Sequence, residues 1–263
     1  MSIRQHIPNA LTSSNLLCGV FAVLAVVQGN ATDAFLLVCL GALFDFFDGF
    51  AARLLGVSSP VGKELDSLAD VVTFGVVPAV MASQLTLFFL SKGSWTLPEF
   101  VLIVLTYAGL LIAAFSALRL AKFNLDTRQS DSFIGLPTPA NAMFWGGLFV
   151  SRPLLEHLLF ACSIPATAVV VVLLLMIALS CWIMVAEVPM FALKFKHFRP
   201  EGDNLLRYGF VLAALLLSLG GFLAGFDGLG LSAAIVLYVV ISLFTQRAKP
   251  ANHDDQLVFP EVK

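Results

Sequence analysis

The chain has 263 residues, of which 59% are hydrophobic and only 12% are charged, and its formal net charge at pH 7 is −2. A soluble domain contains about 45–50% apolar residues, so this composition excludes an ordinary soluble globular protein. It indicates a protein whose solvent is the lipid bilayer, and we expect no nucleic-acid partner.

Apolar segments recur along the chain, and most reach the roughly 20 residues with which a helix crosses about 30 Å of hydrocarbon. They predict an all-α, polytopic integral membrane bundle of about eight transmembrane helices. The expected spans are 9–29, 32–55, 66–90, 98–122, 136–152, 158–187, 204–225 and 228–246. The fifth is short, and Pro137 and Pro139 interrupt its beginning. The first eight residues lack the layout of a cleavable signal, so we expect the first span to be retained.

The positions of the 15 Lys and Arg residues predict an orientation for this bundle. With eight spans, thirteen of them fall on one side, and only Lys92 and Arg152 fall on the other. Cytoplasmic loops are enriched in Lys and Arg, so both termini are expected in the cytoplasm. We expect residues 1–246 to form one domain in the cell (inner) membrane, with its active site facing the cytoplasm, and residues 247–263 to form a polar cytoplasmic tail.

Four aspartates stand close together where the second span ends and the third begins. Asp45 and Asp48 are three residues apart, and Asp66 and Asp70 are four apart. Each pair therefore lies on one face of its helix. The short cytoplasmic turn between the spans should make the two helices antiparallel neighbours. We expect the four carboxylates to converge in one pocket near the membrane surface.

Carboxylates at this position need compensating charge, because each aspartate within a span costs about 2.5–3.5 kcal/mol on the insertion scale. Hard divalent cations bind carboxylate oxygens, and pairs of them about 3.5–4 Å apart recur in phosphoryl-transfer sites. The cluster therefore predicts divalent cations, Mg²⁺ or Mn²⁺. Zinc is a poorer candidate because no histidine lies beside the aspartates.

Small residues around the aspartates favour a site for phosphate. Gly49 and Ala52 follow the first pair within about one turn, and Gly62 precedes the second pair, so a ligand can approach the backbone closely. Arg53 presents a planar guanidinium suited to a phosphate or a carboxylate. Small residues also permit tight helix packing in membranes, and an arginine at a cytoplasmic helix end is also a common anchor.

The segment from Asp45 to Asp70 resembles the signature of the CDP-alcohol phosphatidyltransferase family. Its pattern, D-x2-D-G-x2-A-R-x8-G-x3-D-x3-D, fits that signature at every defined position. The resemblance implies an integral membrane enzyme that displaces CMP from a CDP-linked lipid with an alcohol, at a site with two divalent metal ions. The metal ligands that it implies are Asp45, Asp48, Asp66 and Asp70, with Asp70 also as the catalytic base. The CDP site that it implies is lined by Asp48, Gly49, Ala52, Arg53, Gly62 and Asp66.

Further stretches resemble one branch of this family, the phosphatidylserine synthases. They are IPNALTSSNLLCG at 7–19, LDSLADVVTFGVVPA at 65–79, ALRLAKFN at 117–124, FIGLPTPANA at 133–142 and MFALKFKHF at 190–198. This branch implies CDP-diacylglycerol and L-serine as substrates, and phosphatidylserine and CMP as products. A homodimer is common in the family that the chain resembles.

A serine pocket needs a partner for the carboxylate of serine. Arg119, at the cytoplasmic end of the fourth span, is the first candidate, and Lys122 and Asn124 lie close behind it. Basic residues at such a helix end are also ordinary membrane anchors. Thr12 and Asn15 are polar residues within the first span, so we expect them to face the bundle interior. There they would contact a substrate or bond a neighbouring helix.

Two other functions fit parts of the sequence. A sister enzyme of the same family would use glycerol phosphate or inositol phosphate, and the cations Arg119, Lys122 and Arg128 do not exclude such an acceptor. A cation transporter would also place aspartates within the membrane. It would need polar groups along a path through the bilayer, however, and the outer halves of the predicted spans are nearly uncharged.

Overall fold

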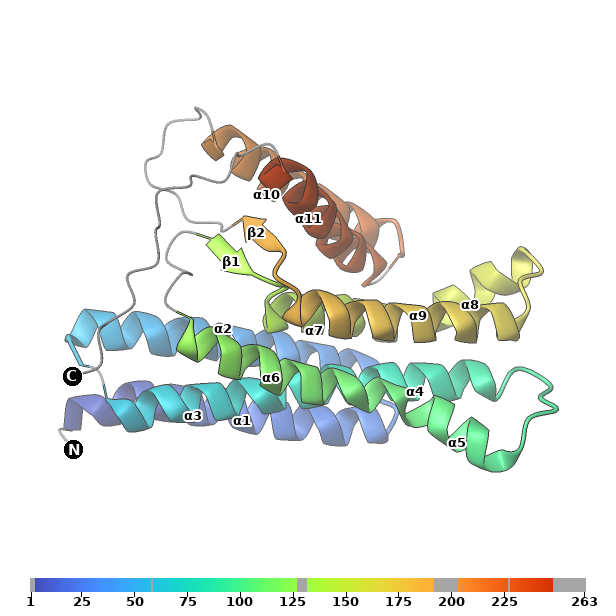
Figure 1. Cartoon of the computed structure of the whole chain (residues 1–263), viewed down its shortest axis with the longest axis horizontal. Helices are drawn as coiled ribbons and strands as arrows, with labels where there is room; N and C mark the ends of the chain where they lie inside the picture. Colours follow the sequence, from blue (N-terminus) through green and yellow to red (C-terminus); the bar gives the residue numbers. More distant parts are fainter. Residues whose placement is uncertain (1–2, 58, 127–131, 192–202, 227, 248–263) are drawn as a thin grey trace, which may run out of the picture.

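The computed structural model describes residues 3–57, 59–126, 132–191, 203–226 and 228–247, so the predicted tail lies almost wholly outside the described residues. Within these ranges the chain is a bundle of helices with one short pair of strands (Figure 1). The elements are α1 (Ile3–Val27), α2 (Ala31–Leu55), α3 (Pro60–Asp70), η1 (Val71–Val76), α4 (Val77–Leu90), α5 (Glu99–Tyr107), η2 (Ala108–Leu110), α6 (Leu111–Leu125), β1 (Ser132–Ile134), α7 (Thr138–Val150), α8 (Arg152–Ala161), α9 (Ala166–Val185), β2 (Pro189–Phe191), α10 (Asp203–Leu223) and α11 (Leu229–Arg247).

Helices long and apolar enough to cross a membrane confirm an all-α, polytopic membrane protein. Among the described residues there are six, His6–Val27, Ala31–Leu55, Pro60–Leu90, Glu99–Leu125, Ala166–Val185 and Asn204–Leu223. A shorter apolar stretch, Leu229–Thr245, lies in α11. The predicted span 136–152 contains α7, which has 13 residues. At 1.5 Å per residue α7 is about 20 Å long, which is less than the hydrocarbon thickness of a bilayer.

Two predicted boundaries are wrong, and local sequence signals explain both. The third helical segment begins at Pro60 and not at residue 66, because Ser59 caps it by accepting a hydrogen bond from the Gly62 amide at 2.9 Å. Proline at the first helical position suits such a start. The predicted span 158–187 is divided between α8 and α9 by residues 162–165, where Ser163 has a positive φ of 55°.

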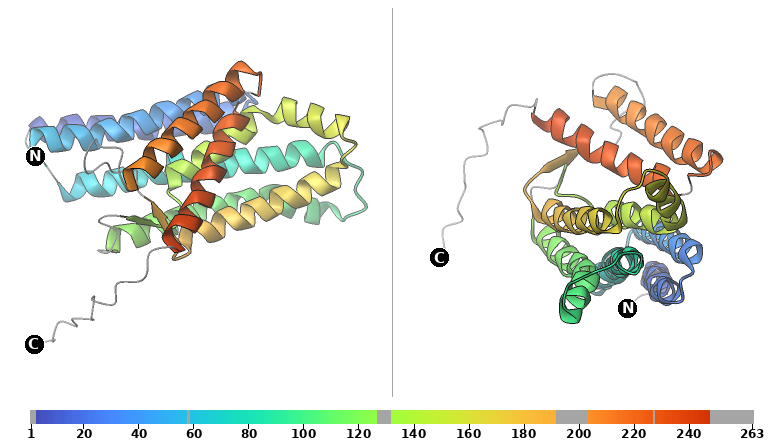
Figure 2. Two further views of the ribbon diagram at one scale, coloured as in Figure 1. Left: turned by 90° about the horizontal axis from the view of Figure 1, so that it is seen from above. Right: turned by 90° about the vertical axis from the view of Figure 1, so that its right-hand side faces the viewer.

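The helices pack in layers around α4 (Figure 2). Met81, Leu85 and Phe89 of α4 are buried in the main hydrophobic core. The α7 and α9 helices lie against α4, and the hairpin of α10 and α11 covers the far side of α7. The α1 helix also lies against α4, and the helices that carry the aspartates, α2 and α3, pack against α1.

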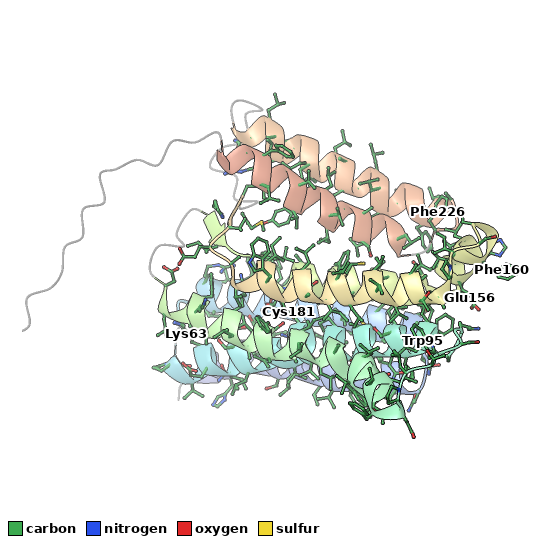
Figure 3. The ribbon with its side chains drawn as sticks, turned by 45° about the vertical axis from the view of Figure 1, so that its right-hand side comes forward. Lys63, Trp95, Glu156, Phe160, Cys181 and Phe226 are labelled. Carbon is green, nitrogen blue, oxygen red and sulfur yellow. The ribbon has the colours of Figure 1, made fainter. Side chains whose placement is uncertain are left out.

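The two ends of the bundle carry different groups. Figure 3 places Lys63 at one end and Glu156 at the other. At the second end Lys92 forms an ion pair with Glu156 at 2.6 Å, and Arg152 donates a hydrogen bond to the Gly29 carbonyl at 2.8 Å. The first helix begins and α11 ends on the same side of the bundle (Figure 1).

A short antiparallel strand pair joins the chain before α7 to the chain after α9. Ser132 of β1 pairs with Phe191 of β2, and Ile134 pairs with Pro189. Gly135 follows with a φ of 75°, and a Cβ atom there would collide with the backbone around Met184. Only glycine fits this turn without strain, and the turn carries the chain from β1 into α7.

Candidate active site

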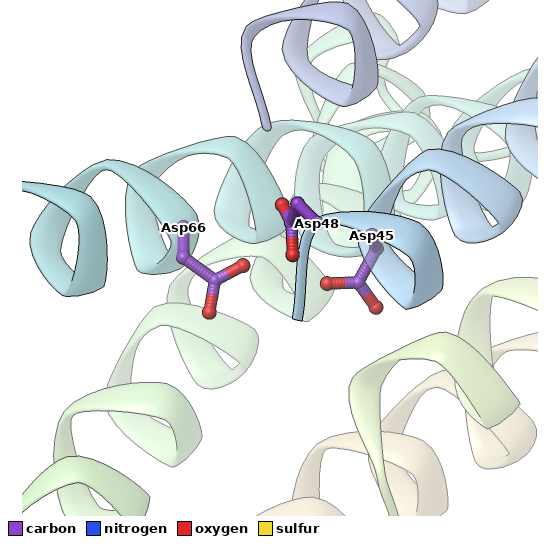
Figure 4. A group of neighbouring side chains, drawn as sticks. All are labelled: Asp45, Asp48 and Asp66. Atoms are coloured by element: carbon purple, nitrogen blue, oxygen red, sulfur yellow. The ribbon is translucent and has the colours of Figure 1, made fainter. Parts of the chain in front are cut away.

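Three of the four predicted metal ligands meet in a compact acidic group. Asp45 and Asp48 extend from α2 and Asp66 from α3, and each offers a carboxylate oxygen within 4.8 Å of the other two (Figure 4). Asp48 is 7% exposed. Asp66 Oδ1 is buried and has no hydrogen-bond partner among the described residues. Carboxylate oxygens this close together form a set of ligands that could hold a cation, and an all-oxygen donor set suits a hard divalent ion.

Asp70 stands apart from this compact group, one helical turn beyond Asp66. Its Oδ1 accepts a hydrogen bond from Asn15 Nδ2 at 3.2 Å. It is close enough to Asp45 and to Arg119 for their charges to interact. The predicted base therefore lies between the acidic group and a buried cation. Asp70 is the last residue of α3, directly before the π-helix η1, a feature the sequence did not reveal.

The first helix is the element that brings the two aspartate pairs together. It packs against both α2 and α3, whereas α2 and α3 make few direct contacts. The two helices thus meet mainly through α1 and through their carboxylates, which approach one another within 4.8 Å. Asp48 is seven residues before Leu55, the end of α2, which places it about 10 Å inside that end.

Two polar residues of α1 donate hydrogen bonds to two of the aspartates. The Thr12 hydroxyl lies 2.6 Å from Asp48 Oδ2, to which it donates a hydrogen bond, and Asn15 donates to Asp70. Thr12 is 3% exposed and Asn15 is fully buried, as predicted for residues facing the bundle interior. Thr73 donates a hydrogen bond to the Asn15 carbonyl at 3.0 Å, which ties η1 to the same turn of α1.

A cavity of about 240 Å³ opens beside the acidic group, between α1, α2 and α3. Five of the six residues predicted for the CDP site line it, namely Asp48, Gly49, Ala52, Gly62 and Asp66. A Cβ atom on Gly62 would come within 3.0 Å of Ser59 Oγ, so glycine keeps this wall thin. Arg53 does not line the cavity, but a Cβ atom on Gly49 would lie 3.5 Å from its Nη1.

The sequence interpretation missed several residues of this first cavity. Ser59 and Lys63 line it beside Gly62, and Pro8 and Asn9 of α1 line it too. Asn9 Oδ1 would lie 3.1 Å from a Cβ atom on Gly62. Ser59 followed by Pro60 is a helix-start signal that could have identified the first of them. Lys63 occupies an undefined position of the signature, so the pattern gave no reason to select it.

A second cavity of about 330 Å³ lies between the end of α6, β1 and the end of α9. Arg119 and Lys122 line it. Arg119 is 6% exposed, its Nε atom is buried without a hydrogen-bond partner among the described residues, and its guanidinium carbon lies 5.1 Å from the Phe123 ring centroid. Tyr238 of α11 is close enough to Arg119 for an electrostatic interaction.

The predicted serine-pocket residues therefore do not form one group. Arg119 and Lys122 lie at the second cavity, while Thr12 and Asn15 bond the aspartates. Asn124 points elsewhere, because its Nδ2 donates a hydrogen bond to Ser67 Oγ of α3 at 2.8 Å. That bond fastens the end of α6 to α3.

Comparison with known proteins decides the family. A sequence model of the CDP-alcohol phosphatidyltransferases matches residues 5–193, which include both aspartate pairs and both cavities. The chain belongs to the CDP-alcohol phosphatidyltransferase family. The resemblance seen in the signature is confirmed at this level. The acidic group of this CDP-alcohol phosphatidyltransferase lies within the residues that match the family model.

Curated relatives of this CDP-alcohol phosphatidyltransferase carry closely related names. The CDP-diacylglycerol–serine O-phosphatidyltransferase of Bacillus subtilis strain 168 is 40% identical over 140 residues, which are 53% of this chain and 72% of the relative. The protein of the same name from Helicobacter pylori strain J99 is 38% identical over 138 residues, 52% of this chain and 54% of the relative. The archaetidylserine synthase of Methanothermobacter thermautotrophicus is 33% identical over 139 residues, 52% of this chain and 54% of the relative. The matches thus span about half the length of the last two.

Proposed function

We propose that this chain transfers a phosphatidyl group from CDP-diacylglycerol to the hydroxyl of L-serine, which releases CMP and forms phosphatidylserine. The observation that carries the proposal is the convergence of Asp45, Asp48 and Asp66 within 4.8 Å in a chain of the CDP-alcohol phosphatidyltransferase family. The names of the relatives from Bacillus and Helicobacter support serine as the acceptor.

In this proposal the residues that hold divalent cations are Asp45, Asp48 and Asp66, with Asp70 as a further ligand. Mg²⁺ and Mn²⁺ both suit a set of carboxylate oxygens. When bound, such ions neutralise the pyrophosphate oxygens and stabilise the charge on the departing CMP. The hydrogen bond from Thr12 fixes the orientation of the Asp48 carboxylate, and so prepares the site for its ions.

The proposed transfer is a displacement at the phosphorus that carries the diacylglycerol. A bond forms between this phosphorus and the serine hydroxyl oxygen, and the bond to the CMP oxygen breaks. The proton of the serine hydroxyl passes to Asp70, and CMP leaves with the electron pair of the broken bond. Asn15 holds Asp70 in place through its hydrogen bond at 3.2 Å. An ordinary carboxylate is a weak base for an alcohol, so the rate depends strongly on this positioning.

The first cavity is the proposed site for the CDP group. Gly49, Ala52 and Gly62 leave room for a ligand against the backbone, and Lys63 supplies positive charge at the cavity wall. The amino end of α3, capped by Ser59, faces the same cavity, and the partial positive charge of a helix amino end favours phosphate. Arg53 is proposed to meet the ligand from the side of Gly49.

The orientation in the membrane is also a proposal. We place residues 1–246 in the cell (inner) membrane, the tail in the cytoplasm, and the aspartates toward the cytoplasmic side. The asymmetry of the Lys and Arg residues supports this choice. Lys63, at one end of the bundle (Figure 3), lines the same cavity as Asp48 and Asp66.

Release of CMP from CDP-diacylglycerol by the purified protein tests this function. The reaction is run with and without L-serine, with Mg²⁺ or Mn²⁺ and with a chelator, and the lipid product is identified by mass spectrometry. We expect phosphatidylserine only when both the metal and serine are present. A matched reaction with glycerol phosphate or inositol phosphate in place of serine tests the sister activities. Product from one of these acceptors, and none from serine, would refute the proposed acceptor.

A further inference from the structure

The second cavity contains acidic residues to which the proposed reaction gives no role. Asp126 and Glu187 line it together with Arg119 and Lys122. The charged side chains on its described lining are therefore two cations and two acids. Glu187 follows α9, whereas Arg119 and Lys122 belong to α6, so groups of opposite charge come from different elements.

Arg119 is the group on this lining that requires a ligand. Its side chain is 6% exposed, and its Nε atom is buried without a hydrogen-bond partner among the described residues. A buried guanidinium with an unused donor is costly, and a planar carboxylate satisfies it by accepting two parallel hydrogen bonds. The contact with Phe123 covers a face of the guanidinium and leaves the in-plane donors for such a ligand.

We propose that this second cavity binds the zwitterionic amino acid acceptor, with Arg119 taking its carboxylate and Glu187 taking its ammonium group. The inference rests on the proposed function and adds to it a residue that selects the acceptor. Glu187 lies in neither the signature nor the acidic group.

The charge balance of the cavity decides the class of acceptor. A zwitterion brings one positive and one negative group, which match a lining with both signs. An alcohol phosphate brings two negative charges and no positive one, so it matches the two cations of the lining but not its two acids. The cavity thus favours serine over glycerol phosphate or inositol phosphate by mismatch with the wrong ligand as well as by attraction of the right one.

The position of Arg119 connects this cavity to the reaction. Arg119 is close enough to Asp70 for their charges to interact, while its cavity opens toward β1 and the end of α9. The carboxylate and the hydroxyl of serine are separated by only a few bonds. In this proposal a serine held by Arg119 and Glu187 extends its hydroxyl past Arg119 toward Asp70.

The test compares two ligands that differ only at the ammonium group. L-Serine is used as substrate, and 3-hydroxypropanoate, which has the same carboxylate and hydroxyl but no ammonium group, is used as competitor. For Glu187→Gln we expect the serine KM to rise roughly ten- to hundredfold, the range for a lost hydrogen bond to a charged group. The inhibition constant of 3-hydroxypropanoate should stay the same or fall, and Glu187→Asp should recover part of the serine affinity.

Several results would overturn the inference. Equal changes for both ligands would mean that Glu187 supports the fold and does not bind the ammonium group, and an unchanged serine KM would remove it from the site. Glu99→Gln, an exposed acid at the start of α5, is the matched control and should change neither constant. The wild-type protein provides an independent test. If it bound L-serine and 3-hydroxypropanoate equally well, an ammonium subsite would be refuted. Absence of serine-dependent CMP release from wild type would instead refute the proposed function.

Discussion

Thr12→Val tests whether α1 prepares the acidic group for metal. Valine has nearly the shape of threonine, so the change removes the hydroxyl that donates to Asp48 Oδ2 at 2.6 Å and leaves the packing in place. Thr12 and Asp48 are 3% and 7% exposed, so their hydrogen bond is largely shielded from bulk water. A hydrogen bond to a charged group contributes about 1.5–3 kcal/mol, which corresponds to roughly ten- to hundredfold in affinity. Loss of a residue that orients a metal ligand has effects of this same size.

The assay is a titration of CMP release against Mg²⁺ or Mn²⁺, with Mn²⁺ binding followed separately by electron paramagnetic resonance. We expect the metal midpoint of Thr12→Val to rise by about ten- to hundredfold. Thr86→Val is the matched control, because Thr86 is equally buried but donates only to the Ala82 carbonyl of its own helix at 2.9 Å. Equal midpoints for Thr12→Val and wild type, or equal shifts in both variants, would refute the role assigned to Thr12.

Three further predictions address the base, the turn before α7 and the orientation. Asp70→Asn should lose at least about a hundredfold in turnover, the lower range for general base catalysis, and remain folded. Asp33→Asn, at an exposed position, is its control. Near-normal synthesis by Asp70→Asn would contradict the role of Asp70 as the base. Gly135→Ala should lower the free energy of unfolding by about 1–3 kcal/mol, because the φ of Gly135 is 75° and the backbone at Met184 occupies the space of a Cβ atom. Gly209→Ala, which has open space at its Cβ, is the control and should not lower it. Thermal unfolding in detergent measures both variants. Cys162, which is exposed between α8 and α9, should react with an impermeant maleimide added outside the cell. The Cys162→Ala variant is the control and should show no such labelling. Labelling only in inverted vesicles would reverse the proposed orientation.

The fold class and the family were accessible from sequence because each rests on a local pattern. Spans are set by runs of apolar residues, and the signature from Asp45 to Asp70 keeps its acids at fixed helical spacing. The division of the predicted sixth span into α8 and α9 was missed because residues 162–165 are too short to lower the hydropathy of a long window. The early start at Pro60 was missed because apolar content was weighed above the cap at Ser59.

Contacts between distant segments were less accessible from sequence. The burial of Thr12 and Asn15 followed from their polarity within a span, but the aspartate that each one bonds depends on how α1 packs between α2 and α3. Asn124 was predicted beside Arg119, yet the helical rotation between positions 119 and 124 directs it to Ser67. No local pattern reports a tertiary contact of this kind.

The proposed acceptor cavity lies within the family match, but a helix beyond that match also approaches it. Residues 5–193 match the family and contain the acidic group and both cavities. Arg119 also interacts with Tyr238 of α11, which lies beyond that match, and the Tyr238 hydroxyl donates to the Phe191 carbonyl of β2 at 2.9 Å. The last helix therefore helps to position the strand pair beside the second cavity. In the two proposals, chemistry on the CDP lipid and choice of the alcohol involve different elements of one bundle, so the acceptor is inferred from the second cavity and not from the signature at 45–70.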